Sequence, residues 1–370
     1  MMRTFQILAL ILAGSALQLA AAPVFYPGTK SIAKNKHLVL IGSDHEYRSE
    51  ETIPALARIL AKHHGFDCTV LLGVDPKSGE VVAGVSNVPG MEALAKADGL
   101  IIFARFLQLP DDQMKHLDDY LNRGGPVMGL RTSTHAFNYK KDANSPYKKY
   151  HFKYNGDDYK GGFGHQVLGQ TWVGHYGGNH SQCTVIDVIP EKADHPILRG
   201  VKNAWVHAGG YNAVPQDDWE ALTMAQPMNG MKPTDEADAK KPPKVSEWTR
   251  HYTAANGTKA RVFTSLYGAS EDLLNDGYRR MLVNAAYWLV GLEDQIKADA
   301  PIDFVGPYRP NLFCFGGHAQ GVKPEVAYAG FESPVPANND CQGRRPKRQA
   351  STVESVREAT AALAAARAQK

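Results

Sequence analysis

The stretch Pro126-Val-Met-Gly-Leu-Arg-Thr-Ser-Thr-His-Ala-Phe137 decides the fold, because a short apolar run breaks there into hydroxyl residues and a histidine. The pattern is typical of a buried parallel strand that ends in a tight turn before a helix, an elbow that lifts a side chain out of the sheet. Hydrolases carry Gly-x-Ser-x-Gly at this elbow, whereas this chain reads Gly129-Leu-Arg-Thr-Ser133. The exposed tip is therefore predicted to carry the guanidinium of Arg131, which cannot act as a base but can orient oxygen-rich ligands.

Short apolar runs before and after the elbow alternate with helical patterns. Strands are expected at 37–42, 67–73, 98–104, 126–130, 184–189, 245–250 and 260–266, and helices at about 52–64, 91–96, 110–122 and 278–289. The first four strands and their helices predict an α/β fold, because right-handed crossovers place such strands in parallel. We expect a flavodoxin-like, doubly wound and mostly parallel sheet with helices on both faces.

Ligands bind to such sheets beyond the carboxyl ends of the strands, where the strand order reverses. The loops after the first, third and fourth strands are expected to lie side by side there, and they carry chemically active side chains. The residues predicted to share this crevice are Asp44, His45, Arg105, Arg131, Thr132 and His135. We predict acid–base roles for Asp44, His45 and His135 and substrate binding by the other three.

Each of these residues also has a purely structural interpretation. Asp44 could cap its own loop, and Arg131 could hold that loop through an ion pair with Glu46 or Asp44. Thr132 and Ser133 could cap the helix expected after the elbow instead of acting as nucleophiles. His135 would lie about one turn into that helix.

A segment rich in Gly, Tyr, Lys and His runs from Asn138 to about residue 180 and indicates a long active-site loop. Trp172 in this segment and the later Tyr211 are predicted to bind substrate. His175 and His180 could bind zinc with His135 or His45 opposite, leaving one coordination position open. The alternative is a sugar-binding wall without metal, because the usual Glu companion and the tight His-x3-His spacing are absent.

Four motifs in order resemble the ThuA-like (trehalose utilisation) family: Asp44-His-Glu-Tyr-Arg-Ser-Glu-Glu51, the elbow itself, His195-Pro-Ile-Leu-Arg-Gly200 and Arg261-Val-Phe-Thr-Ser265. The resemblance spans about residues 37–293. It implies a class I glutamine-amidotransferase-like fold and a role in carbohydrate metabolism. The elbow has no cysteine, so glutaminase chemistry is not expected. Relatives often carry an acid before the middle tyrosine, where this chain has Gly210 before Tyr211.

The motifs and the resemblance together predict an acid–base enzyme that processes a glycoside or keto-glycoside without a cysteine nucleophile. Two alternatives stay open: a non-catalytic glycan-binding module that uses the same crevice, and a metal-assisted hydrolase that uses the loop histidines. All three predict a carbohydrate ligand.

The first 22 residues read as a secretory signal peptide. Arg3 supplies the positive start, residues 5–20 form an apolar run, and Ala20-Ala-Ala22 precedes Pro23. The alternative is a retained membrane anchor. We expect an exported, periplasmic or extracellular protein with no stable membrane span and no nucleic-acid partner.

Export permits disulfides, and four cysteines allow three pairings. Cys314 and Cys341 lie in the irregular extension expected at 294–350 and are the favoured pair, whereas Cys68 is expected to be a buried apolar residue. Residues 341–370 carry a net charge of +5, which leaves −2 for the rest of the chain. The Ala-rich helical tail at 351–370 has little apolar bulk and is expected to be detached or frayed.

Overall fold

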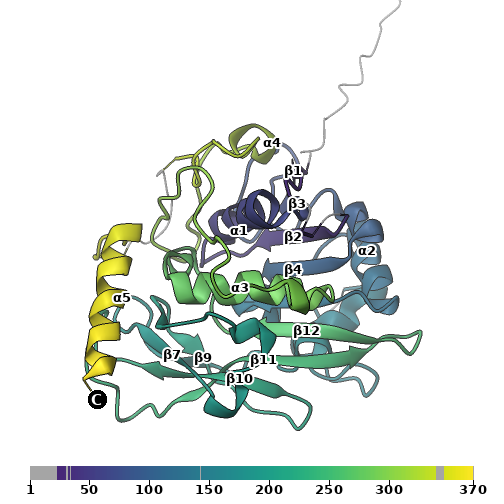
Figure 1. Cartoon of the computed structure of the whole chain (residues 1–370). Helices are drawn as coiled ribbons and strands as arrows, with labels where there is room; N and C mark the ends of the chain where they lie inside the picture. The colour runs from purple at the N-terminus through teal and green to yellow at the C-terminus, as the bar shows by residue number, and fades with distance from the viewer. Residues whose placement is uncertain (1–22, 31, 34, 142, 339–345, 370) are drawn as a thin grey trace, which may run out of the picture.

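The computed structural model describes residues 23–338, apart from 31, 34 and 142, and residues 346–369. A ten-stranded sheet runs through the molecule in the order β1-β3-β2-β4-β5-β12-β11-β10-β7-β8, and helices pack around it (Figure 1). The α/β class is as predicted, but the sheet is mixed rather than mostly parallel. The predicted signal peptide lies outside the described residues.

The elbow belongs to the parallel half of this sheet. Strands β2, β3, β4 and β5 pair in parallel, and β12 continues the parallel pairing on the other side of β5. The bounds are β2 (His37–Ser43), β3 (Asp67–Leu72), β4 (Gly99–Ala104), β5 (Val127–Leu130) and β12 (Lys259–Ser265). A short strand in the expected polar leader, β1 (Val24–Tyr26), pairs antiparallel with β3.

The other half of the sheet is antiparallel and begins at β11. This strand is joined to β12 by a short turn, which only antiparallel strands can use, and the two pair antiparallel. This half comprises β7 (Thr184–Val188), β8 (Ala204–Val206), β10 (Glu220–Pro227) and β11 (Lys244–Thr253). The sequence predicted β7, β11 and β12 but missed β8 and β10. Two short strands, β6 (His175–Tyr176) and β9 (Gly210–Tyr211), pair apart from the main sheet.

Side chains alternate between the two faces of the parallel strands, so each face has its own core. Leu38, Leu40 and Phe103 pack with α1 (Ser49–His64) and α3 (Asp276–Leu289). Val39, Ile41 and Ile102 pack on the other face with α2 (Asp111–Asn122) and the 3₁₀ helix η1 (Met91–Lys96). Helices on both faces leave the strand ends as the free edge of this half.

Helix α1 begins earlier than predicted, at Ser49 with Arg48 as its N-cap residue. The expected cap, Thr52, lies inside the helix, and its hydroxyl donates to the Gly268 carbonyl oxygen at 2.9 Å. The difference matters for the site, because the earlier start brings the helix to the end of the loop that carries Asp44.

The expectation that the tail is detached or frayed is wrong. After the short α4 (Pro324–Ala327), helix α5 (Val353–Ala368) packs beside the β7 and β8 end of the sheet (Figure 1). Val356 and Leu363 are buried, and the Trp205 indole N–H donates to Thr360 Oγ1 at 2.8 Å. Two buried apolar residues make too short an apolar stripe for the Ala-rich sequence to indicate that this helix packs on the fold.

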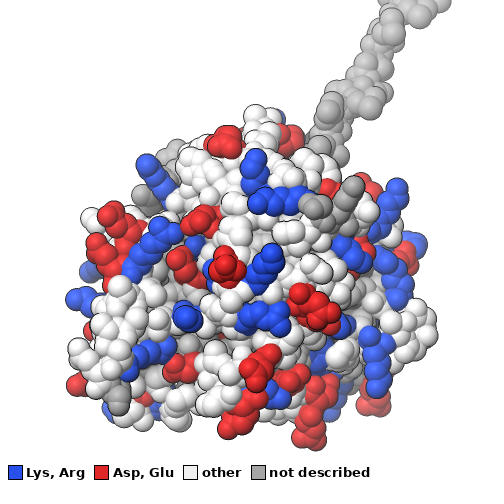
Figure 2. All heavy atoms as spheres, in the orientation of Figure 1, with Lys and Arg blue, Asp and Glu red and all other residues white. Residues whose placement is uncertain are grey.

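Cys68 is buried as predicted, and burial raises its thiol pKa well above the usual value. Cys341 lies outside the described residues, so its pairing with Cys314 stays a prediction. In the described part of the chain, no helix combines the length and the apolar character needed to cross a membrane. Lys and Arg side chains intermingle with Asp and Glu on the face shown in Figure 2.

Candidate functional site

Strand β5 ends in η2 (Arg131–His135), a single 3₁₀ turn instead of the helix expected after the elbow. Arg131 adopts φ 43°, and Phe106, just beyond β4, adopts φ 54°. Non-glycine residues rarely take positive φ, and such strain tends to persist at functional sites. The Ser133 hydroxyl donates to the Ile102 carbonyl oxygen at 2.7 Å and fixes this turn to β4.

Side chains from several distant segments meet at this edge of the sheet, and we call them the elbow cluster. Ring contacts, cation–π contacts and electrostatic coupling connect its members to one another, except Thr132, which belongs to it as the neighbour of Arg131 in the chain. The elbow cluster comprises Asp44, His45, Tyr47, Arg105, Arg131, Thr132, His135, Trp172, His175 and Tyr211. The loops after β2, β4 and β5 therefore do lie side by side, as the sequence predicted.

Arg131 is fully buried, so the prediction of an exposed guanidinium at the elbow tip is wrong. Its guanidinium carbon lies 3.6 Å from the ring centroid of Tyr47 and 4.9 Å from that of Tyr211. Burial alone would lower the pKa of Arg131, but Tyr47 and Tyr211 raise it, so the residue stays charged. The two aromatic rings come from distant segments and cover the tip, which no local pattern at the elbow reveals.

The suggested ion pair between Arg131 and the β2 loop is also wrong. Arg131 Nη1 donates to the Leu266 carbonyl oxygen at 3.3 Å and Nη2 to Asn179 Oδ1 at 3.4 Å. Glu46 pairs with Arg105 instead. Each cation of the elbow cluster is thus held in place by a different part of the fold.

Asp44 both caps its loop and keeps an oxygen for other use. Its Oδ1 accepts the backbone N–H of Glu46 at 2.7 Å and that of Tyr47. Its Oδ2 is buried and has no hydrogen-bond partner among the described residues. The structural interpretation of Asp44 is therefore correct for one oxygen, and the other is free to accept a hydrogen bond from a ligand.

His135 lies on the floor of the elbow cluster and is held neutral. Its pKa is well below the usual value, first because of burial and then because of Arg105 and Arg131. The Thr134 hydroxyl donates to the Arg131 carbonyl oxygen at 3.3 Å and contacts His135 Nδ1 at 3.1 Å. Because His135 stays neutral, one of its ring nitrogens carries the proton and the other accepts a hydrogen bond.

His45 and His175 lie at the rim of the elbow cluster. His45 is half-buried, and burial lowers its pKa while the neighbouring Asp44 opposes that shift. His175 is exposed on β6, with its ring centroid 5.6 Å from Trp172 and 5.5 Å from Tyr211. Partial burial and Arg131 lower its pKa. The rim imidazoles are therefore uncharged near neutral pH and reachable from solvent.

The elbow cluster contains an unusual concentration of unsatisfied polar atoms. Five of its buried atoms have no hydrogen-bond partner in the described part of the chain: Asp44 Oδ2, Arg105 Nε, Arg131 Nε, Thr132 Oγ1 and Trp172 Nε1. A buried polar atom without a partner costs about 1–3 kcal/mol, so folded proteins rarely keep several together without a use for them. Donors predominate in this set, which suits a ligand rich in oxygen.

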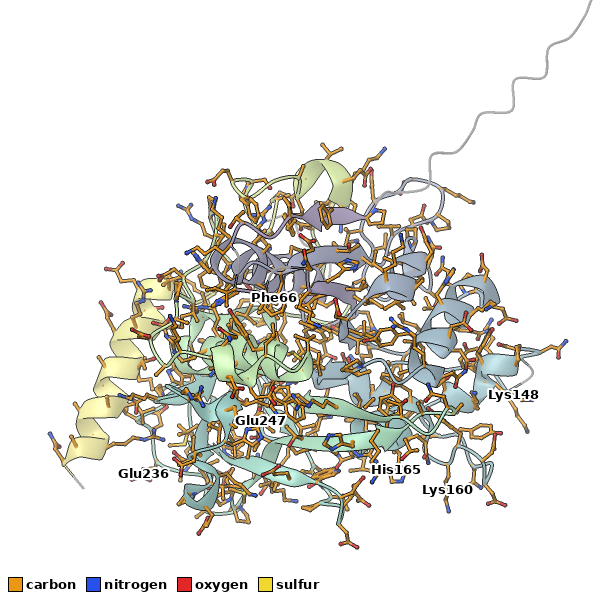
Figure 3. All side chains as sticks on the ribbon, turned by 45° about the vertical axis from the view of Figure 1, so that its right-hand side comes forward. Phe66, Lys148, Lys160, His165, Glu236 and Glu247 are labelled. Atoms are coloured by element: carbon orange, nitrogen blue, oxygen red, sulfur yellow. The ribbon has the colours of Figure 1, made fainter. Side chains whose placement is uncertain are left out.

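The predicted zinc site does not fit the described donors. His180 stacks on Phe313 at 4.1 Å between ring centroids, and Arg348 Nε donates to its Nδ1 at 3.2 Å. Burial and Arg348 lower its pKa to about 4. Within the described residues, no group of three or more His, Cys, Asp or Glu side chains could hold a metal ion. A third histidine of the same Gly-rich segment, His165, lies near Lys160 (Figure 3).

Sequence reasoning missed the residues that shape the surroundings of the elbow cluster. Asn179 donates to Tyr47 Oη at 3.0 Å and accepts from Arg131, and Phe106 lies 4.9 Å from His135 between ring centroids. Phe315 reaches the rim from the C-terminal extension. The position of Phe106 just beyond β4 is the one signal of its role in the sequence, because the ends of parallel strands line ligand sites.

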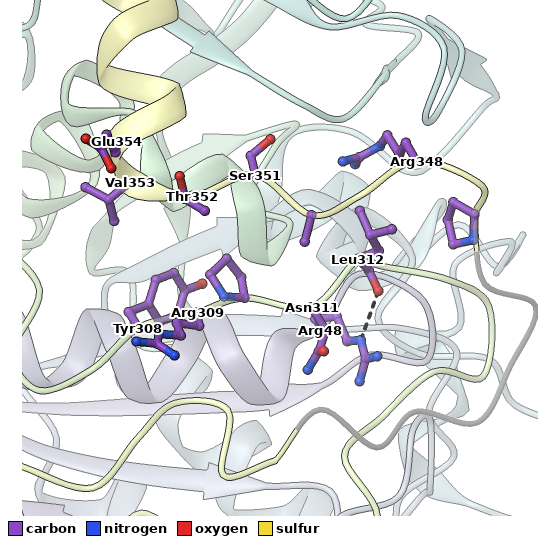
Figure 4. A pocket seen from close by; sticks show the side chains of 13 residues that line it. Arg48, Tyr308, Arg309, Asn311, Leu312, Arg348, Ser351, Thr352, Val353 and Glu354 are labelled. Carbon is purple, nitrogen blue, oxygen red and sulfur yellow. Dashed lines mark hydrogen bonds between the residues drawn. The ribbon is translucent and has the colours of Figure 1, made fainter.

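A cavity of about 650 Å³ lies elsewhere, between residues 308–312 and the segment that leads into α5 (Figure 4). Its lining includes Arg48, whose Nε donates to the Leu312 carbonyl oxygen at 3.3 Å, and Arg348, which pairs with Glu271 at 2.5 Å. None of the described residues that line it is a histidine. Size alone therefore does not make it the better candidate for acid–base chemistry.

Comparisons with known proteins give structural likenesses only. No family model matches the chain, and no curated protein matches it in sequence. The chain is similar to a thua-like protein from Bacteroides uniformis ATCC 8492, at 14% identity over 74% of this chain and 98% of that one, with a TM-score of 0.44. It is also similar to a thua-like protein from Parabacteroides merdae ATCC 43184, at 16% identity over 74% and 92% of the two chains, with a TM-score of 0.43.

The glutaminase domain of Trypanosoma brucei CTPS with bound acivicin is a further likeness, at 8% identity over 73% of this chain and 97% of that one, with a TM-score of 0.34. These names agree with the resemblance that the sequence motifs indicate. At such identities and TM-scores the likenesses carry no argument about chemistry, so function has to be inferred from the elbow cluster itself.

Proposed function

We propose that this protein is an exported, ThuA-like enzyme of carbohydrate utilisation that processes a glycoside or keto-glycoside by acid–base chemistry at the elbow cluster. The observation that carries the proposal is the set of five unsatisfied polar atoms beside neutral imidazoles at the ends of β2, β4 and β5. The strand order there agrees with a doubly wound, glutamine-amidotransferase-like parallel half. The motifs shared with the ThuA-like family direct the choice of substrate class.

Proton transfer in the elbow cluster is assigned to His45 and Asp44. His45 is half-buried with Asp44 beside it, so its pKa is lowered less severely than that of His135, and it is the better proton-transfer group near neutral pH. Asp44 Oδ2 accepts a sugar hydroxyl. No side chain of the protein has to act as a nucleophile, in agreement with an elbow that carries arginine.

The remaining groups hold the sugar. His135 accepts a hydroxyl hydrogen through its unprotonated ring nitrogen, since its strongly lowered pKa keeps the imidazole neutral. The N–H groups of Arg105 and Trp172 donate to sugar oxygens, and Trp172 offers an apolar face to the ring. Arg131 contributes its positive charge from beneath the rings of Tyr47 and Tyr211. Fixed donors around the reacting sugar supply orientation without reorganisation during the reaction.

A non-catalytic glycan-binding module is the second candidate. It is favoured by one observation, the burial of Arg131 under two tyrosine rings at the position where related elbows carry the reactive group. The two candidates differ in turnover and not in binding.

The test combines calorimetric sugar binding with turnover on a panel of glycosides and keto-glycosides. We expect wild-type protein to bind and convert at least one of them, and His45→Ala to bind it with nearly unchanged affinity while losing turnover. Binding without any turnover across the panel would support the module, and absence of binding would reject both candidates. Export is tested separately by sequencing the N-terminus of secreted protein, which we expect to begin near Pro23.

A further inference from the structure

Phe315 is an exposed aromatic side chain at the rim of the elbow cluster, although it comes from the C-terminal extension. Its side chain is 64% exposed, a large fraction for a phenylalanine. Its ring meets the His45 ring edge-on, with centroids 4.7 Å apart and planes at 83°. The guanidinium carbon of Arg105 lies 5.7 Å from the same ring. One face of Phe315 thus contacts the site while the side chain projects into solvent.

The loop that carries Phe315 is anchored on both sides of it. The Gly316 N–H donates to the His45 carbonyl oxygen at 2.6 Å, and Gly316 takes φ 75°, which favours glycine. Phe313 is fully buried, with its ring centroid 5.0 Å from Tyr47. The fold therefore holds the backbone against the site and leaves only the Phe315 ring exposed.

A line of rings leads from the floor of the elbow cluster to this exposed ring. The centroid of His135 lies 4.9 Å from Phe106, Phe106 lies 6.0 Å from His45, and His45 lies 4.7 Å from Phe315. A pyranose ring is about as wide as one of these steps from ring centroid to ring centroid. The line has three such steps, so a single sugar ring held by Asp44 and His135 would not reach Phe315, and contact with Phe315 requires at least one further ring.

We propose that Phe315 is a stacking platform for the second ring of a glycoside whose first ring is held at the floor of the elbow cluster. The inference rests on the proposed function and adds to it that the substrate has at least two rings. The apolar C–H face of a pyranose packs on an aromatic face, and such contacts add affinity without entering the chemistry. Phe315 is thus a specificity-determining residue for the length of the substrate.

The experiment compares Phe315→Ala with wild type in calorimetric titrations with trehalose, cellobiose and methyl glucoside. We expect Phe315→Ala to raise the Kd of a disaccharide by about three- to tenfold and that of methyl glucoside by less than twofold. Phe315→Trp should retain disaccharide affinity, because it keeps an aromatic face. Phe25→Ala is the matched control, since Phe25 is 53% exposed on β1 and should leave both affinities unchanged.

The outcomes separate this inference from the proposed function. Wild-type protein that binds neither disaccharides nor methyl glucoside would overturn the proposed function and this inference with it. Wild-type protein that binds a disaccharide, with Phe315→Ala binding it equally well, would overturn this inference alone. An equal loss for methyl glucoside and the disaccharide would also overturn it, because Phe315 would then belong to the first-ring site.

Discussion

Glu247 and Asp44 are both buried carboxylates of the central fold, but their oxygens have different surroundings. Glu247 Oε1 accepts from Ser265 at 2.7 Å, and Oε2 accepts from Thr223 and Ser246, within the antiparallel half (Figure 3). Asp44 Oδ2 in the elbow cluster has no partner among the described residues. A satisfied polar cluster stabilises the fold, whereas an unsatisfied one keeps its capacity for a ligand. Substitutions at the two carboxylates should separate stability from function.

The largest expected effect is on turnover at the elbow cluster. His45→Ala should lower kcat by about 10²–10⁴-fold, the usual contribution of a positioned acid–base group, with little change in the denaturation midpoint. Asp44→Asn should also lower kcat, because its free oxygen loses charge. Steady-state kinetics with urea unfolding of the same samples measures both. Equal turnover in wild type and His45→Ala would remove His45 from the chemistry.

Glu247→Ala should show the opposite behaviour. It leaves the hydroxyls of Ser265, Thr223 and Ser246 without their acceptor, which we expect to cost about 3 kcal/mol of unfolding free energy. Glu247→Gln is the matched control and should cost less, because it keeps one acceptor oxygen. The kcat of the folded fraction should stay at the wild-type level. A strong loss of kcat at full folding would contradict the assignment of Glu247 to stability.

A third prediction concerns pH and a histidine outside both clusters. His64 contacts Tyr287 Oη and the Pro301 carbonyl oxygen, each at 2.9 Å, and burial lowers its pKa to about 4. The unfolded chain takes up a proton near pH 6.5 and the folded chain does not, so stability is lost as pH falls from about 6.5 to 4.

The loss linked to His64 should reach about 3 kcal/mol at pH 4, from the difference between the two pKa values. Urea unfolding at pH 8 and pH 4.5 should show a smaller pH effect in His64→Gln than in wild type. Identical pH effects in the two proteins would show that His64 titrates normally in the folded state.

The smallest effect is expected where α5 meets the rest of the molecule. Arg348 pairs with the buried Glu271 and donates to His180, so it connects the segment before α5 to the Gly-rich segment. Arg348→Met should cost about 1–2 kcal/mol, less than the ~3–5 kcal/mol of a fully buried pair, because Arg348 is partly exposed and Glu271 keeps the Ser351 backbone donor. Hydrogen exchange should then quicken near residues 172–180. Arg367→Met, which breaks the exposed pair with Asp187, is the control and should leave that exchange unchanged.

The sequence predicted the parallel half well, because its strands are short apolar runs, and β3 and β5 each follow a helix stop at glycine. It therefore placed Asp44, Arg105 and His135 correctly at one edge of the sheet. The strands β8 and β10 were missed because they are short or only partly buried and lack a strong period-two pattern. The docking of α5 depends on Trp205 and on ion pairs between distant segments, which no local pattern shows.

At the site, sequence reasoning identified residue types and strand ends but not burial. It could not predict that Tyr47 and Tyr211 enclose Arg131, since those rings approach from distant loops. It also could not bring Phe315 to His45, because the extension has no periodic pattern to follow. Long-range packing of irregular segments decides both features.

The most direct test of the central claim is a crystal structure of the protein soaked with a disaccharide that calorimetry shows to bind. We predict electron density for a sugar ring against Asp44 Oδ2 and Trp172 Nε1, with a second ring over Phe315. Density confined to the 650 Å³ cavity beside Arg48 and Arg348, with the elbow cluster unchanged, would contradict the account.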